Sequence, residues 1–305
     1  MEGQIKILVL GGTGMLGHKV FQVLGRRIPD TWCTVRGPSS DARWQRIDLF
    51  RGGNVIGDLD VADCSVLERL LSEHRPKVIV NCIGVIKQRP EAMASIPSIA
   101  INALLPHRLA DLCQRWGGRL IHISTDCVFR GDRGSYSEED FADATDLYGR
   151  TKFLGEVSSG NTLTLRTSFI GRELKHFNSL LEWLLSQNHK KIVGYTQALY
   201  SGVTSNYLAE LVARIIEQHA ELSGLYQVTG PTISKFELLG LLRDAFGLDL
   251  EIVPDDKFFC DRSMKGDKFL HATGHRCPPW PALIAQLGND TTPYNEWRGN
   301  AQQDI

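Results

Sequence analysis

Tyr148 and Lys152 stand four residues apart, a spacing that places a phenol and an amine on one face of a helix. An unperturbed phenol, with a pKa of about 10, exchanges protons poorly near neutral pH. A neighbouring ammonium favours the phenolate and lowers that pKa, which suits a tyrosine to general acid–base chemistry. Because many helices carry Tyr and Lys on a solvated face, the pair needs support from other segments. Ser124-Thr125-Asp126 and a glycine-rich loop near the N-terminus provide it.

The glycine-rich loop follows an apolar run and opens a helical pattern. Gly11 permits a tight turn, Gly14 lets the backbone approach a pyrophosphate, and Gly17 lets the helix and strand pack closely. The N–H groups and dipole at the start of the helix then favour phosphates. A plain strand-to-helix turn is the alternative, but the position between strand and helix favours dinucleotide binding. The predicted cofactor-binding residues of the loop are Gly11, Thr13, Gly14, Met15, Leu16 and Gly17.

The end of the second apolar run bears on the choice of cofactor. Sites that prefer NAD usually place an acid there for the ribose hydroxyls. Here Arg36 is followed by no acid until Asp41. A cation suits the 2′-phosphate of NADP, and Ser39 and Ser40 could add hydrogen bonds. A solvated strand-end charge is the alternative for Arg36. We therefore expect NADP(H) as the cofactor.

Two later strand ends could also contact the cofactor. Asp60-Val61 closes the third predicted strand, where an acid can meet the adenine amino group; a cap for the next helix is an equal alternative. Cys82-Ile83-Gly84 follows the fourth strand. A small residue there would let the chain pass close to the cofactor, or it could simply form a turn.

Short apolar runs alternate with helical patterns through the first half of the chain. Strands are predicted over 5–10, 31–36, 54–61, 77–82, 119–124 and 162–167. Helices are predicted over 15–26, 65–74, 96–116 and 146–157. This alternation predicts a parallel sheet covered on both faces by helices. The expected fold class is α/β, with a Rossmann-type doubly wound parallel sheet.

The second half is less regular. Helices are predicted over 180–187 and 205–219, a strand over 225–229, a helix from Ser234 to Phe246 opened by a capping box with Glu237, and a last short helix after Pro281. We expect an NADP-binding domain over 1–170, completed by part of 195–230. A smaller α/β region over 171–290 would mainly bind substrate, and a polar, frayed tail would follow over 291–305.

Composition excludes several classes of protein. The chain has 305 residues, of which 42% are hydrophobic and 23% charged, with a formal net charge of −1. These values give no electrostatic case for nucleic acid or an anionic membrane. No apolar run approaches a transmembrane helix and no signal peptide is apparent, so we expect a cytoplasmic protein. Seven scattered cysteines indicate reduced thiols. No metal site is predicted, since His271, His275 and Cys277 stand among turn residues.

Together the motifs resemble those of the extended short-chain dehydrogenase/reductases. The glycine pattern, Ser124-Thr125-Asp126 and Tyr148-x-x-x-Lys152 occur in the order of that family. Residues 124–129, 136–140, 148–156 and 165–168 are similar to those of dTDP-4-dehydrorhamnose reductases. The resemblance covers most of the chain and is strong over 5–170.

The resemblance implies roles for individual residues. Tyr148 would donate a proton to the reduced carbonyl, and Lys152 would bind the nicotinamide ribose and lower the tyrosine pKa. Thr125 would hydrogen-bond the carbonyl oxygen, the alternative being a strand-end hydroxyl bonded to the backbone. Asn102 matches a family asparagine that orders backbone and water. The implied activity is NADPH-dependent reduction of the 4-keto group of a dTDP- or UDP-linked 6-deoxy-4-ketohexose, for deoxysugar and polysaccharide precursors.

The sequence is also compatible with other functions. The 4,6-dehydratases of the superfamily carry Thr-Asp-Glu, so Cys127 after Asp126 disfavours dehydration. The rhamnose reductases commonly carry an aromatic at this position, which leaves the sugar nucleotide open. A 4-epimerase and a regulatory subunit resembling that of methionine adenosyltransferase are alternative functions, and a homodimer is an open alternative to a monomer. The residues that could contact a substrate are Arg172, Lys175, His176, Tyr195, Tyr200, Arg262 and Lys265, each of which could instead be a surface charge or a half-buried aromatic.

Overall fold

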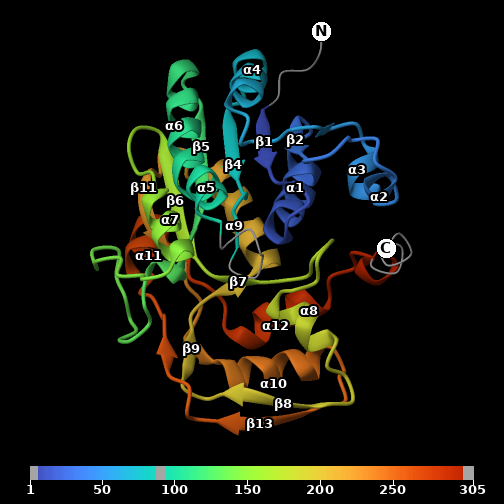
Figure 1. The fold of residues 1–305 in the computed structure, drawn as a ribbon, viewed down its shortest axis with the longest axis vertical. Coiled ribbons are helices and arrows are strands. Elements are labelled where there is room, and N and C mark those ends of the chain that lie inside the picture. Colours follow the sequence, from blue (N-terminus) through green and yellow to red (C-terminus); the bar gives the residue numbers. More distant parts are fainter. Residues whose placement is uncertain (1–5, 87–93, 298–305) are drawn as a thin grey trace.

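The computed structural model describes residues 6–86 and 94–297, and its main feature is a sheet of seven parallel strands (Figure 1). The strand order is β11-β6-β5-β4-β1-β2-β3, which is the Rossmann order. From β1 the strands are added outward to β3 on one side, and the chain then crosses back to place β4 on the other side of β1. The predicted α/β doubly wound fold is therefore confirmed. The strands are β1 Ile7–Leu10, β2 Thr31–Thr34, β3 Val55–Ile56, β4 Val78–Asn81, β5 Arg119–Thr125, β6 Thr162–Thr167 and β11 Gly224–Gln227.

The central strand β1 shows why helices cover both faces of the sheet. Its side chains alternate between two cores, because successive residues of a strand point to opposite faces. Ile7 and Val9 join the core that contains α1 and α9, whereas Leu8 and Leu10 join the core that contains α4 and α6. A strand that is apolar on both faces is typical of a parallel sheet buried in this way. The helices are α1 Met15–Arg27, α4 Cys64–His74, α6 Leu105–Trp116 and α9 Ser205–Gln218.

The third strand is shorter than predicted. It ends at Ile56 and not at residue 61, because Asp58 takes a left-handed conformation with φ 56°. Asp60 and Val61 therefore lie in the turn that leads to α4. The alternative that Asp60 caps this helix is wrong, since the Asp63 side chain accepts hydrogen bonds from the first turn. Two short helices, α2 Ala42–Gln45 and α3 Asp48–Arg51, precede β3.

The helix predicted over 96–116 contains a change in winding. It consists of α5 Ser95–Ser98, a π-helical segment Ile99–Leu104, and α6. Pro106 has no N–H to donate within such a helix, and π segments recur at functional sites. A Cβ added at Gly155 would lie 2.0 Å from the carbonyl oxygen of Asn102, so α7 (Leu147–Leu154) ends directly against the π segment.

The smaller region lies below the carboxyl ends of the large sheet in Figure 1. Its helix α10 is opened by the predicted capping box, in which Ser234 and Glu237 bond to each other's backbone N–H groups. The elements of this region are β7 Phe169–Ile170, α8 Leu180–Leu185, β8 Lys191–Tyr195, β9 Ala198–Tyr200, β10 Val203–Thr204, β12 Ile233–Ser234, α10 Lys235–Ala245, β13 Glu251–Asp255, β14 Cys260–Asp261 and α12 Trp280–Gly288. The helix α11 Asp267–Thr273 instead packs beside β11 of the large sheet.

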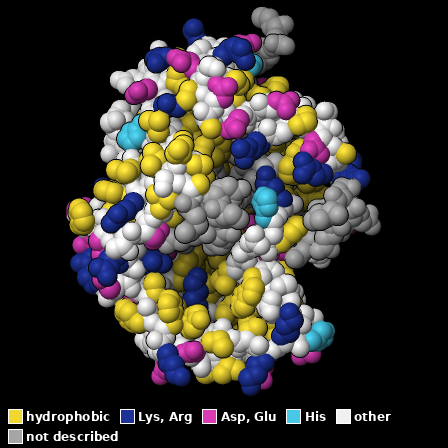
Figure 2. Space-filling model, viewed as in Figure 1, with side chains coloured by type: hydrophobic (Ala, Val, Ile, Leu, Met, Phe, Trp, Pro, Cys, Tyr) yellow, Lys and Arg dark blue, Asp and Glu magenta, His cyan; other side chains and the backbone are white. Residues whose placement is uncertain are grey.

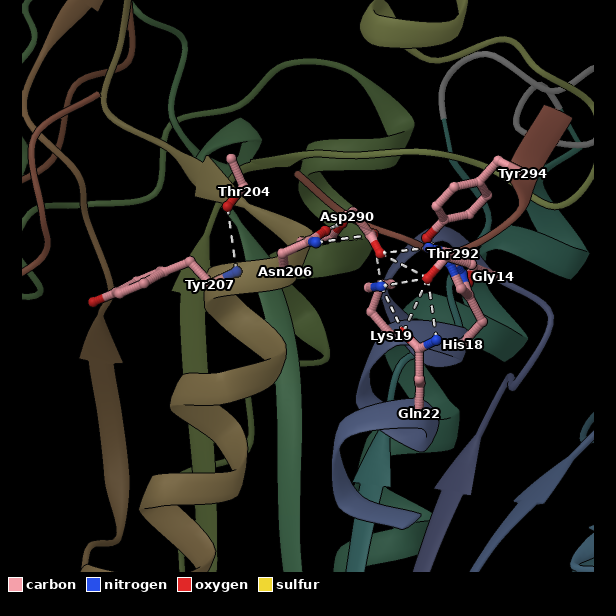
Figure 3. Close-up of polar contacts among 11 residues, drawn as sticks. Gly14, His18, Lys19, Gln22, Thr204, Asn206, Tyr207, Asp290, Thr292 and Tyr294 are labelled. Carbon is pink, nitrogen blue, oxygen red and sulfur yellow. Dashed lines mark hydrogen bonds and ion pairs between the residues drawn. The ribbon is translucent and has the colours of Figure 1, made fainter. Parts of the chain in front are cut away.

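The expectation of a frayed tail is wrong as far as Trp297. Tyr294 and Trp297 are only 4% and 9% exposed, respectively. Figure 3 shows the polar contacts that hold this segment against α1. The Tyr294 hydroxyl lies 2.7 Å from His18 Nε2, and Lys19 Nζ lies 2.7 Å from Asp290 Oδ2. The C-terminal segment thus supports the helix that follows the glycine-rich loop.

Gly17 gives a test of how tightly that helix meets the loop. A Cβ at Gly17 would lie 2.1 Å from the carbonyl oxygen of Gly11, closer than atoms can approach. We expect Gly17→Ala to lower the free energy of unfolding by about 1–3 kcal/mol, as overpacking does. Gly25→Ala is the matched control in the same helix, because nothing lies within 4 Å of its added Cβ. This control should be neutral or stabilising. Urea unfolding measures both variants, and equal stabilities would contradict the packing argument.

Candidate active site

A cavity of about 350 Å³ opens at the carboxyl ends of the central strands. It lies where the strand order reverses between β1 and β4, the position at which open α/β sheets bind ligands. Figure 2 shows this face of the molecule hollowed below the sheet, with hydrophobic and basic side chains on the walls. The predicted site residues that line the cavity are Thr13, Gly14, Met15, Leu16, Cys82, Ile83, Gly84, Thr125, Tyr148, Lys152 and Tyr200.

The glycine-rich loop fits a phosphate group. Gly11 has φ 84°, and a Cβ there would lie 2.9 Å from Ile83 Cγ1, so only glycine suits the turn. The helix α1 begins after Gly14, and no side chain caps it. Its first-turn N–H groups are therefore left for water or a ligand beside the cavity. Gly11 and Gly17 shape the loop and do not line the cavity themselves.

The strand end at Thr125 and the helix α7 bring the three predicted catalytic residues together. Asp146 caps α7 by accepting from Gly149 N at 3.0 Å. A Cβ at Gly149 would lie 2.3 Å from the carbonyl oxygen of Cys127, so the helix packs directly on the strand end. Tyr148 thereby reaches Thr125, and their side chains hydrogen-bond. Thr125 Oγ1 also accepts from Cys127 N at 3.2 Å, so its backbone role and its place in the cavity coexist.

Burial controls the ionisation of Tyr148 and Lys152. It raises the pKa of Tyr148 well above the usual range, opposed by the hydrogen bond with Thr125. Burial also lowers the pKa of Lys152 to about 8. Lys152 Nζ donates to Ile123 O at 2.7 Å. Desolvation dominates at Tyr148 and keeps its phenol protonated, so a lowering of the tyrosine pKa by Lys152 stays a prediction. A protonated phenol is the form that can donate a proton.

Asn102 has the ordering role that was predicted. Its Oδ1 accepts from Val85 N at 2.8 Å, and its Nδ2 donates to Val85 O at 3.0 Å. The same Nδ2 lies 3.3 Å from Thr151 Oγ1 on α7. Asn102 therefore joins the segment after β4 to the helix that carries Tyr148 and Lys152.

Several predicted substrate residues lie outside the lining of the cavity. Arg172 Nε donates to Glu182 Oε1 at 2.8 Å in a buried ion pair, so its guanidinium serves the interior and the prediction of a diphosphate contact is not supported. Arg262 Nε donates to Phe129 O at 2.8 Å, in the segment that follows β5. His176 has a left-handed backbone with φ 70°. Substrate contacts of Arg262 and His176 stay predictions.

Arg36 and Asp60 lie beside each other at the edge of the site. Arg36 Nη2 is 3.4 Å from Asp60 Oδ2, and the two side chains are 80% and 51% exposed. Such an exposed pair contributes little to stability. Neither residue lines the cavity, nor does Val61, whose side chain is buried. The arginine is therefore available to an anion at this edge.

Two lysines of the smaller region also line the cavity. Lys175 Nζ donates to Thr13 Oγ1 at 2.7 Å, so this lysine lies over the glycine-rich loop. Lys235 Nζ lies 3.9 Å from the centre of the Tyr200 ring. Our sequence reasoning missed Lys235. Its signal was a cation at the first position of a capped helix, where the helix dipole disfavours positive charge.

The chain matches the family described as "RmlD substrate binding domain" over residues 5–255. It belongs to this family. The match spans both the large sheet and most of the smaller region. The family therefore covers every residue that lines the cavity.

Proteins that are similar in sequence to this chain carry two kinds of name. Methionine adenosyltransferase 2 subunit beta from Mus musculus is 32% identical over 153 residues, 50% of this chain and 41% of that protein. dTDP-4-dehydrorhamnose reductase from Streptomyces griseus is 33% identical over 150 residues, 49% of this chain and 43% of that protein. The chain thus matches less than half the length of either relative.

A solved structure shows the same fold across nearly the whole chain. It is dTDP-4-dehydrorhamnose reductase from Bacillus anthracis, in complex with NADP. The TM-score is 0.76 at 20% identity, with 93% of this chain and 99% of that chain covered. The smaller region is thus part of the shared architecture.

Three further observations concern the cysteines, the possible metal ligands and the helix lengths. All seven cysteines are free thiols. Within residues 6–86 and 94–297, no group of three or more His, Cys, Asp or Glu side chains is arranged to hold a metal ion. In the same part of the chain, no helix has the length and apolar character that crossing a membrane requires.

Proposed function

We propose that the protein reduces the 4-keto group of a dTDP- or UDP-linked 6-deoxy-4-ketohexose, with NADPH as cofactor, in the synthesis of deoxysugar or polysaccharide precursors in the cytoplasm. One observation carries the proposal. Thr125, Tyr148 and Lys152 line the same cavity as the glycine-rich loop and the uncapped N-terminus of α1. NADPH, when bound, supplies the hydride. The reductase names of the S. griseus and B. anthracis proteins support the choice of substrate class.

The residues of the chain would bind the substrate and deliver a proton. Thr125 and Tyr148 lie at the same wall of the cavity, so a substrate carbonyl oxygen placed against them would accept a hydrogen bond from each hydroxyl. Because burial keeps the Tyr148 phenol protonated, it can pass its proton to the oxygen as negative charge develops there. Lys152, one turn along α7, would hold the ribose hydroxyls of the cofactor and help to restore the proton on Tyr148.

Other side chains would position the two ligands. The first turn of α1 and Lys175 would bind the cofactor pyrophosphate. Cys82, Ile83 and Gly84 would lie along the cofactor beside β1. Lys235 and Tyr200, from the smaller region, would contact the sugar nucleotide on the other side of the cavity.

Arg36 is proposed to select NADPH over NADH. Its exposed guanidinium can pair with a 2′-phosphate, a charge-assisted hydrogen bond worth ~1.5–3 kcal/mol, or roughly 10- to 150-fold in affinity. Arg36→Ala should raise the KM for NADPH by that factor and leave NADH use nearly unchanged. Arg43→Ala is a suitable control, because Arg43 is an exposed arginine already bonded to Asp41. If Arg36→Ala leaves the ratio of the KM values for NADPH and NADH unchanged in steady-state kinetics, the main support for NADP as the cofactor is lost.

A regulatory role is the second candidate, because the M. musculus relative is a subunit named for methionine adenosyltransferase. The complete set of Thr125, Tyr148 and Lys152 favours catalysis instead. A screen of dTDP- and UDP-linked 4-ketosugars for NADPH oxidation separates the two. Oxidation with one of these sugars supports the reductase. Absence of oxidation with every sugar, together with binding to a methionine adenosyltransferase catalytic subunit, would favour the regulatory role.

A further inference from the structure

His122 lies behind the proposed catalytic residues, on β5, and its side chain is completely buried. Its Nε2 lies 3.4 Å from Lys152 Nζ, and its Nδ1 lies 3.1 Å from Asn81 Nδ2 at the end of β4. A line of three buried polar side chains thus runs from the sheet to the cavity.

The backbone fixes the direction of the hydrogen bonds along this line. Ile83 N donates to Asn81 Oδ1 at 3.1 Å, so the oxygen of the amide is taken and its Nδ2 must be the group that faces His122. An amide nitrogen only donates, so His122 Nδ1 must accept. A neutral imidazole that accepts at Nδ1 carries its proton on Nε2. The imidazolium would place two donors against each other at Asn81, and burial also lowers the pKa of His122 far below its usual value.

The Nε2–H of His122 therefore points at Lys152 Nζ. An ammonium has three donors and no acceptor, so it is repelled by this N–H, whereas a neutral amine can accept from it. Lys152 Nζ can at the same time donate to Ile123 O. We propose that His122, held by Asn81, is a positioning residue that gives Lys152 a hydrogen-bond donor and so favours the neutral amine. The role in proton supply that this gives Lys152 rests on the proposed function.

The charged and titratable groups around Lys152 do not account for a preference for its neutral amine. Glu156, just after the end of α7, attracts the ammonium, but its carboxylate is already bonded to Arg166 Nη2 at 2.6 Å and to Ser124 Oγ at 2.6 Å. Cys82, at the end of β4, also favours the ammonium electrostatically. His107 on α6 acts electrostatically on His122 and disfavours its protonated form. Burial favours the amine, and the proposed His122 donor would add to its effect.

Lys152 would then exchange a proton closer to neutral pH than an ordinary lysine does. The consequence for catalysis is that Lys152 could pass a proton toward Tyr148 and recover it within the same pH range. A lysine with a pKa in its ordinary range, about 10.4, would hold its proton too tightly for that exchange.

NMR of the whole protein without added ligands tests the proposal in two measurements. Long-range ¹H–¹⁵N spectra of the imidazole should show His122 protonated at Nε2. Titration of lysine labelled with ¹³C at Cε, with the Lys152 signal assigned from its loss in Lys152→Met, should give a Lys152 pKa about 0.5–1 unit higher in His122→Phe than in the wild type. That shift is the size expected from the loss of one hydrogen bond.

Two further variants make the result specific. His122→Gln keeps an N–H donor and should leave the Lys152 pKa closer to the wild-type value. His107→Gln changes the neighbouring histidine, whose ring bonds to Leu154 O, and should leave the Lys152 pKa unchanged. A proton found on His122 Nδ1 would overturn the proposal, as would an unchanged or lower Lys152 pKa in a folded His122→Phe. Neither measurement requires a ketosugar substrate, so a failure of the proposed reaction would be seen separately.

Discussion

Tyr148→Phe is expected to lower kcat for ketosugar reduction by about 10²–10⁴-fold, the usual contribution of a positioned proton donor. The substitution removes only the hydroxyl, which hydrogen-bonds Thr125 at the wall of the cavity. The aromatic ring stays, so NADPH affinity should change little. Steady-state kinetics at saturating substrate and a fluorescence titration with NADPH measure the two quantities.

Tyr195→Phe is the matched control for this experiment. Tyr195 is 40% exposed and packs against Phe258 with ring centres 4.9 Å apart, away from the cavity lining. Its variant should retain full activity. A near-normal kcat for Tyr148→Phe with saturating substrate would remove Tyr148 from the mechanism.

Lys152→Met should reduce both turnover and cofactor binding, because one amine is proposed to serve both. Loss of the hydrogen bonds from Lys152 to the ribose would weaken NADPH binding by roughly 10-fold. Turnover should fall by at least ~10²-fold, because the proton on Tyr148 is no longer restored. Methionine fills a similar volume, so the cavity should keep its shape. If cofactor affinity and the pH–rate profile both stay as in the wild type, the pairing of Lys152 with Tyr148 is wrong.

The same variant has a predicted effect on stability that depends on pH. Burial lowers the pKa of folded Lys152 to about 8, whereas an unfolded lysine titrates near 10.5. Below pH 8 both states hold the proton and the folded state bears the full desolvation penalty. Between about pH 8 and 10.5 the folded state releases the proton first, so the penalty shrinks as the pH rises.

The stability of Lys152→Met relative to the wild type should therefore be highest near pH 7 and should fall toward pH 10. A change on the order of 1 kcal/mol corresponds to about 2–4 °C in Tm for a protein of this size. Lys6→Met is a control, because Lys6 is exposed and pairs with Asp30 at the surface. A difference in Tm that is the same at pH 7 and pH 10 would mean that Lys152 is not desolvated as the structure indicates.

Short-range patterns predicted the central part of the site. The spacing of Tyr148 and Lys152 places both side chains in the cavity through a single helix, and Gly11, Gly14 and Gly17 fall in one loop and the first turn of the helix that follows it. Such features depend on residues a few positions apart, so a sequence carries them directly. The strand boundaries were less accurate, since β3 ends early at a left-handed Asp58 that periodicity does not reveal.

The remaining features depend on contacts between distant segments. His18 and Tyr294 are separated by 276 positions, and nothing local to the C-terminal segment indicates that it packs against α1. The sequence pattern around Arg172 predicts a phosphate ligand, because an arginine near a strand end looks the same in sequence whether its partner is a ligand or the buried Glu182. His122 was read only as part of a buried strand, because its contacts with Asn81 and Lys152 require the sheet and α7 to be in place.

Transfer of deuterium from NADPH to the sugar tests the central claim most directly. The protein would be incubated with the active dTDP- or UDP-linked 4-ketosugar and NADPH deuterated at the nicotinamide C4, with each of the two stereospecific labels in turn. We predict one deuterium at C4 of the product sugar from one label only, with one NADP⁺ formed per sugar reduced. No such transfer should occur with Tyr148→Phe over the same time. Turnover of the sugar without deuterium at C4 and without net NADP⁺ would contradict the reductase and indicate epimerisation with a retained cofactor.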